Sequence, residues 1–126
     1  MLGRPATRGE KLIALGLGVA AFVVLLLTEP SVGFVRDEGI YFASSESYAN
    51  WIRLVFKEPG TALKDAAIVA AYDTNHEHPA LMKQLYGLSR LLFHTGLDWL
   101  RPASALRLPA LAIAALVQMV RLLFWL

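Results

Sequence analysis

The sequence predicts an all-α membrane protein in which two transmembrane helices of a polytopic fold are joined by a helical exoplasmic loop. Three observations lead to this fold class. Of the 126 residues, 56% are hydrophobic and only 17% are charged, whereas soluble domains have about 45–50% apolar and about 25% charged residues. The apolar residues gather near the two ends of the chain. Nine of the ten acidic residues lie between Glu29 and Asp98, in the segment that separates those ends.

The first apolar segment, residues 12–28, contains no charged residue. Its length is at the short end of the roughly 17–25 residues that cross a hydrocarbon core. A cleaved signal peptide is the alternative, because Arg4, Arg8 and Lys11 precede the apolar stretch. We favour an uncleaved anchor, since the residues that follow, TEPSVGF, offer no small-x-small cleavage site.

The second apolar segment, residues 106–126, reads LRLPALAIAALVQMVRLLFWL. A helix of this kind normally finishes with polar or basic residues, so we expect this span to continue beyond Leu126. The alternative is a C-terminal anchor whose Trp125 lies at headgroup depth.

The Lys and Arg residues predict the orientation. Residues 1–11 carry three of them, whereas residues 29–105 carry seven against nine acidic residues. By the positive-inside rule, residues 1–11 form a cytoplasmic tail and residues 29–105 face the periplasm or an equivalent exoplasmic space. Arg121 then falls close to the cytoplasmic side again. We expect the protein in a bacterial inner (plasma) membrane.

The loop between the spans is predicted to be helical. Arg36–Lys57 has helical periodicity, with Tyr41 and Tyr48 on one face. Because Tyr41, Tyr48 and Trp51 are residue types that settle at headgroup depth, this helix is interpreted as lying along the membrane surface. An ordinary amphipathic helix packed on protein is the alternative.

Two further helices are expected in the loop. Residues 62–72 form a short alanine-rich helix, and residues 79–94 form a longer one with Pro79 in its first turn and Gly96 as its C-cap. The longer helix has an apolar stripe and a polar one with a small gap in it. The apolar stripe consists of Leu81, Leu85, Leu88 and Leu92, and the polar stripe of Lys83, Gly87, Arg90 and His94.

Asp37 and Glu38 are the first candidates for chemistry. They follow the first span by nine residues, which keeps their carboxylates near the membrane surface. A base that acts on a lipid-linked substrate is needed at this depth. Acidic residues are also common in the first turn of a helix, where they favour the macrodipole. From spacing alone, this second interpretation has the better support.

Other chemistry is weakly indicated or excluded. His76, Glu77 and His78 suggest a metal, but the histidine spacing does not match the HExxH pattern, and a polar turn is preferred. Arg107 could anchor its helix by snorkelling or bind a lipid phosphate. The chain has no cysteine, which excludes disulfides, and its net charge of +2 is too dispersed for nucleic-acid binding.

Taken in order, these motifs resemble the N-terminal part of the GT-C glycosyltransferases. The resemblance rests on a short basic tail before one span, on the sequence DEGIY from Asp37, on HPALMK from His78, and on RLP from Arg107. The nearest branch is the protein O-mannosyltransferase family with its bacterial relatives, including the aminoarabinose transferases that modify lipid A. Ala80 departs from that family's HPPL stretch, in which a second proline stands at this position.

The resemblance implies transfer of a sugar from a polyprenyl-phosphate carrier to a hydroxyl of a protein or lipid acceptor, with inversion. Asp37 would be the general base, and Glu38 would orient the acceptor or hold Asp37. The donor phosphate would be bound by Arg107, Lys83 and His78; no cofactor is assigned, and a divalent metal stays open. The competing interpretations are a small two-span structural or assembly protein and a two-span sensor.

Overall fold

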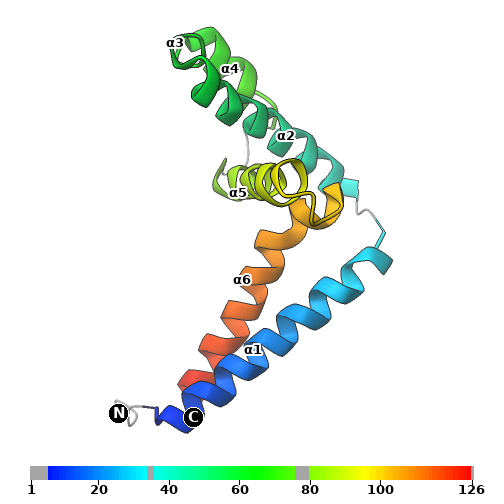
Figure 1. Ribbon diagram of the computed structural model, residues 1–126, viewed down its shortest axis with the longest axis vertical. Helices are drawn as coiled ribbons and strands as arrows, with labels where there is room; N and C mark the ends of the chain where they lie inside the picture. The colour runs from blue at the N-terminus through cyan, green and yellow to red at the C-terminus, as the bar shows by residue number, and fades with distance from the viewer. Residues whose placement is uncertain (1–5, 34–35, 76–79, 126) are drawn as a thin grey trace. The chain divides into compact units, whose positions relative to one another are not determined.

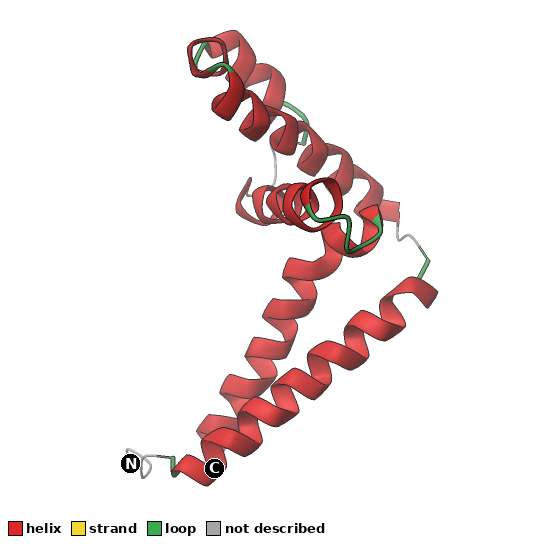
Figure 2. Ribbon diagram, viewed as in Figure 1, coloured by secondary structure: helices red, strands yellow, loops and turns green. Residues whose placement is uncertain are grey.

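A computed structural model describes residues 6–33, 36–75 and 80–125, and the regular elements in these ranges are all helical (Figures 1 and 2). This confirms the all-α part of the predicted fold class. In chain order the elements are α1 (Arg8–Thr28), the 3₁₀ helix η1 (Glu29–Ser31), α2 (Arg36–Lys57), α3 (Pro59–Ala62), α4 (Asp65–Tyr72), α5 (Ala80–Arg90), the π-helix η2 (Leu91–Gly96) and α6 (Pro102–Trp125).

Two of the helices are long and apolar enough to cross a membrane. These candidate spans are Arg8–Ser31 and Pro102–Phe124, with mean hydropathies of 2.4 and 1.7. Only 17% of each apolar window is buried within the structure, whereas the central helix of a large soluble protein is apolar because it is buried. The exposed apolar surface of both helices is therefore what a lipid environment would cover.

Both candidate spans begin before their apolar segments. The α1 helix starts at Arg8 because Thr7 and Glu10 form a capping box. The Thr7 hydroxyl accepts a hydrogen bond from the backbone N–H of Glu10, and the Glu10 carboxylate accepts one from the Thr7 N–H at 2.7 Å. The α6 helix starts at Pro102 and continues through Pro109, which places Arg107 inside the helix rather than before it.

The described chain divides into two compact units. One comprises Met1–Val32 and Ala110–Leu126, and the other comprises Gly33–Pro109. In the first unit, α1 packs on the second part of α6 through small residues. A Cβ atom placed on Gly18 would lie 3.1 Å from the Cβ atom of Met119, so the two helices approach closely there, as membrane helices commonly do.

In the second unit, α2 is the central helix, and α3, α4 and α5 pack on it (Figure 1). Tyr48 is only 1% exposed, and its ring stacks on that of Tyr72 of α4 with a centroid distance of 4.4 Å. Trp51 Nε1 donates a hydrogen bond to the carbonyl oxygen of Ala62 at 3.0 Å. These contacts support the alternative interpretation of α2, a helix whose aromatic face packs on protein.

The shorter predicted helices are partly confirmed. The expected helix over residues 62–72 is interrupted, since α3 ends at Ala62 and Lys64 has an extended backbone before α4. The described part of the helix over residues 79–94 is helical but widens into the π-helix η2. Pro79 itself lies outside the described residues.

The predicted C-cap at Gly96 is wrong by one residue, because Gly96 is the last residue of η2 and Leu97 is the C-cap. The helical segment ends at Gly96, but among the described residues no glycine has a positive φ, and Asp98 adopts the left-handed conformation instead (φ 52°). A Cβ atom on Gly96 would lie 3.2 Å from the carbonyl oxygen of Leu91. Glycine is favoured here because of that close approach and not because of its φ angle.

Candidate functional site

The acidic pair predicted from the sequence occupies the first turn of α2. Asp37 is exposed and Glu38 is half-buried. Two consecutive residues on a helix point about 100° apart, so the two carboxylates face different surroundings. Their position at a helix N-terminus also places both in the favourable field of the helix dipole.

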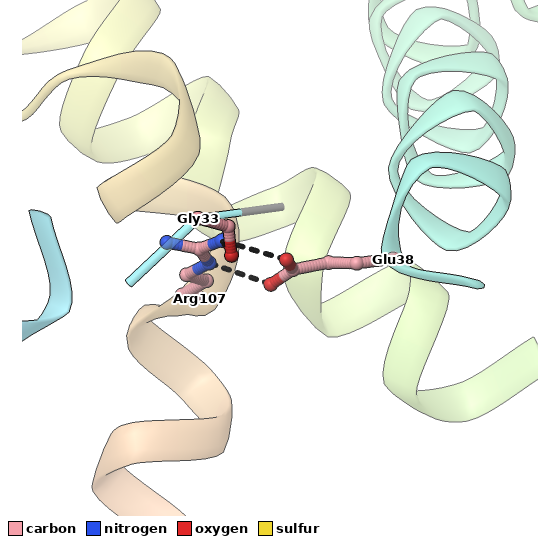
Figure 3. Close-up of polar contacts among 3 residues, drawn as sticks. All are labelled: Gly33, Glu38 and Arg107. Carbon is pink, nitrogen blue, oxygen red and sulfur yellow. Dashed lines mark hydrogen bonds and ion pairs between the residues drawn. The ribbon is translucent and has the colours of Figure 1, made fainter. Parts of the chain in front are cut away.

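Glu38 forms a bidentate ion pair with Arg107, a residue 69 positions later in the chain (Figure 3). Arg107 Nε lies 2.5 Å from Glu38 Oε1, and Arg107 Nη2 lies 2.6 Å from Glu38 Oε2. Nη2 also donates to the carbonyl oxygen of Gly33 at 3.4 Å. The side chains of Arg107 and Glu38 are only 10% and 22% exposed. The start of α2 is therefore tied to the first part of α6.

Aromatic side chains border this ion pair. The guanidinium carbon of Arg107 lies 6.0 Å from the ring centroid of the buried Phe42. Tyr86 of α5 meets Phe42 edge-on, with 6.4 Å between the ring centroids. Burial raises the pKa of Tyr86 above its ordinary value of 10.0, and the charges of Glu38 and Tyr41 add to the shift. The aromatic rings lower the dielectric constant around the ion pair, and this strengthens the electrostatic attraction between Glu38 and Arg107.

Phe42 and Tyr86 were not predicted as site residues. Phe42 follows Glu38 by four positions on the same helix, so helical spacing alone could have placed it beside the acidic pair. Tyr86 reaches the site from α5 through tertiary packing, and no local pattern in the sequence indicates it.

Lys83, a predicted donor-phosphate ligand, is buried on the inner side of α5 and is only 1% exposed. Its Nζ atom donates a hydrogen bond to the carbonyl oxygen of Asn75 at 2.6 Å and lies 5.6 Å from the ring centroid of Tyr48. In this conformation the ammonium group stabilises the turn after α4 and has almost no surface to offer a ligand.

The third predicted donor-phosphate ligand and the predicted metal motif lie outside the described residues. His78, like His76 and Glu77, falls in residues 76–79, outside the described residues. Within the described ranges, no group of three His, Cys, Asp or Glu side chains is placed to hold a metal ion. The structure thus brings together Glu38 and Arg107 from the predicted set, and Asp37 precedes Glu38 in the chain.

Comparisons with known proteins add no relative: no protein family model, no curated protein and no solved structure matches this chain. The assignment of a function therefore depends on the residues and their geometry.

Proposed function

We propose that this chain carries the acceptor-side loop of an inverting membrane glycosyltransferase of the GT-C type, with Asp37 as the general base. One observation supports this assignment above the others. The bidentate pair between Glu38 and Arg107 separates the roles of the two adjacent carboxylates, since Glu38 is engaged while Asp37 is exposed at the start of the same helix. A base needs access to its substrate, and its neighbour needs a fixed position.

The place of the pair in the chain agrees with a lipid-linked substrate. Asp37 follows the end of α1 by nine residues, and Arg107 is the sixth residue of α6. With α1 and α6 as membrane spans, both residues lie close to the ends of the spans on the same side. The reactive end of a polyprenyl-phosphate sugar stays at the membrane surface, and so does the proposed base.

In the proposed reaction, the Asp37 carboxylate accepts the proton of the acceptor hydroxyl. The acceptor oxygen then forms a bond to the anomeric carbon of the sugar. The bond between that carbon and the phosphate oxygen breaks, and its electron pair leaves with the polyprenyl phosphate. Because the acceptor attacks opposite the leaving group, the anomeric configuration inverts.

Arg107 has a positioning role in this proposal. Its Nε and Nη2 atoms already bond the Glu38 carboxylate, so a phosphate group on that edge of the guanidinium would have to displace Glu38. We therefore assign Arg107 first to fixing Glu38 at the start of α2. Contact with the donor phosphate, which the resemblance implies for Arg107, is a second role that requires the pair to open.

The test is transfer of radiolabelled sugar from a polyprenyl-phosphate donor by the intact protein in membranes. Asp37→Asn keeps the size of the side chain but removes the base, and general-base assistance is typically worth about 10²–10⁴-fold in rate. Asp65, an exposed acid in the first turn of α4, provides the matched control. We expect Asp37→Asn to lose about 10²-fold or more and Asp65→Asn to keep wild-type turnover. Wild-type turnover in both variants would show that Asp37 is only a helix N-terminal acid, whereas absence of transfer by the wild-type protein would favour a two-span structural or sensor protein.

A charge exchange separates the positioning role of Arg107 from phosphate binding. Arg107→Ala leaves the Glu38 carboxylate partly buried without its partner, a change that costs about 3 kcal/mol or more when a buried pair is broken. The double exchange Glu38→Arg with Arg107→Glu restores opposite charges across the same gap. Recovery of folding without recovery of transfer would show that one of the two residues also contacts a substrate, Glu38 the acceptor or Arg107 the donor phosphate. Recovery of both would confirm the positioning role.

A further inference from the structure

The two stripes of α5 have the opposite burial from that expected of a helix on a soluble domain. Lys83 is buried against Tyr48 of α2, and Gly87 packs so closely on α2 that a Cβ atom would lie 2.4 Å from the carbonyl oxygen of Ser45. Ser89 is buried on another side of α5, where its Oγ donates to the carbonyl oxygen of Ala105. On the other side, Leu81 is 65% exposed and Leu88 is 50% exposed. Lys83 and Gly87 of the polar stripe thus lie on the inner face, whereas Leu81 and Leu88 of the leucine stripe point outward and Leu85 is half-buried.

The exposed apolar surface continues along the chain toward α6. Leu92 of η2 is 51% exposed, Leu97 is 42% exposed, and Trp99 in the following loop is 71% exposed. We call these residues, together with Leu81 and Leu88, the α5 strip. Burying a leucine completely stabilises a fold by about 1.5–3 kcal/mol, so a strip of this size left in water is unfavourable.

The α5 strip ends close in sequence to the first residue of the candidate span in α6. Trp99 precedes the first residue of α6 by three positions, and three residues extend at most about 10 Å. The candidate span in α6 has 23 residues and is about 35 Å long, slightly longer than the roughly 30 Å hydrocarbon core. The N-terminus of α6 therefore lies at headgroup depth when α6 crosses a bilayer. Trp99 is then within reach of the headgroup layer, where tryptophan is enriched.

We propose that the α5 strip is a lipid-binding surface that inserts into the exoplasmic interface of the bilayer next to α6. This inference rests on the proposed membrane insertion of α1 and α6 and is independent of the transferase chemistry. It assigns to α5 the membrane contact that the aromatic residues of α2 had suggested for α2. The leucines enter the boundary between headgroups and acyl chains, while Lys83 and Ser89 keep α5 attached to the rest of its unit.

The test uses the absence of cysteine in the chain, because single cysteines can be introduced and labelled with an environment-sensitive NBD fluorophore. The labelled positions are Leu88 and Trp99 in the α5 strip, with two controls. Val69 of α4 is an equally apolar side chain that is 61% exposed, and Val24 of α1 is 58% exposed within a candidate span. The full chain is reconstituted in vesicles of phosphatidylcholine and phosphatidylglycerol that carry a nitroxide quencher either near the headgroup or deep in the acyl chain.

We expect the probes at Leu88 and Trp99 to emit at shorter wavelength than the probe at Val69 and to be quenched several-fold more strongly by the shallow nitroxide. The probe at Val24 should be quenched by the deep nitroxide, which reports membrane insertion separately. If Val24 is quenched and Leu88 behaves like Val69, the strip faces water and the inference is overturned while insertion stands. A blue-shifted Leu88 probe without quenching would show that protein covers the strip, and this also overturns a lipid occupant.

Discussion

Helices α2 and α5 pack on each other, and they differ in which face they turn inward. The α2 helix buries Tyr48 and Ala49 and keeps Arg53 outside, as a helix on a protein core does. The α5 helix buries Lys83 and leaves Leu81 and Leu88 exposed. If burial of apolar side chains alone decided the packing of α5, Leu81 and Leu88 would face α2 and Lys83 would be exposed. Steric fit and hydrogen bonds decide its orientation instead, with Gly87 allowing close approach and Ser89 Oγ donating to the carbonyl oxygen of Ala105 at 2.6 Å. Small residues and hydrogen bonds are what hold helices together where lipid covers their apolar surface.

The largest expected difference is in the free energy of unfolding when a buried side chain of α2 or an exposed side chain of α5 is truncated to alanine. Tyr48→Ala should lower the free energy of unfolding by about 3–5 kcal/mol, because it removes a large buried aromatic ring that stacks on Tyr72. Leu88→Ala should change it by less than about 0.5 kcal/mol, since Leu88 is exposed. Urea unfolding in detergent micelles, followed by near-UV circular dichroism, measures both. Similar losses for the two variants would mean that Leu88 is covered by protein and that the contrast between the helices is wrong.

A smaller effect is expected at the crossing point of the two helices. Gly87→Ala places a Cβ atom 2.4 Å from the carbonyl oxygen of Ser45 and 3.3 Å from the Cβ atom of Ala49. The helices must move apart, which should cost about 1–3 kcal/mol. Gly39→Ala on α2 is the matched control, because its Cβ atom would meet nothing within 4 Å. It should raise stability by about 0.5–1 kcal/mol through helix propensity. The same unfolding measurement applies, and a neutral Gly87→Ala variant would place α5 differently on α2.

The smallest expected effect is a pH dependence of the free energy of unfolding, caused by Tyr86 of α5 near Glu38 of α2. Burial and the charge of Glu38 raise the pKa of Tyr86 above 10.0 in the folded protein. The unfolded chain therefore loses this proton first. The contribution of Tyr86 to stability is complete below pH 10 and is lost as the pH rises through the folded pKa, by at most about 1.4 kcal/mol per pH unit. Tyr86→Phe should show a shallower loss of stability above pH 10 than the wild type. Identical slopes would mean that the pKa of Tyr86 is not raised in the folded protein.

The sequence by itself determined the long helices α1, α2 and α6 and the position of the acidic pair at the start of α2, but it did not show the break between α3 and α4 or the π-helix η2. Arg36–Lys57 was predicted with the bounds that the structure shows, because the period of its apolar residues is a local property of the chain. The apolar segments at residues 12–28 and 106–126 lie within α1 and, in their described part, within α6 for the same reason. Asp37 and Glu38 were placed at a helix N-terminus from spacing alone, and they occupy it.

Only the tertiary structure decided which side chains meet and which face turns inward. The pairing of Glu38 with Arg107 joins residues 69 positions apart, and no local periodicity specifies such a contact. The burial of Lys83 depends on the carbonyl oxygen of Asn75 and on the ring of Tyr48, which come from two other segments. A helical period shows that a helix has two faces, but it does not say which face has a partner. That choice depends on the steric fit and hydrogen-bonding groups of the surface opposite, and these exist only once the helices are packed together.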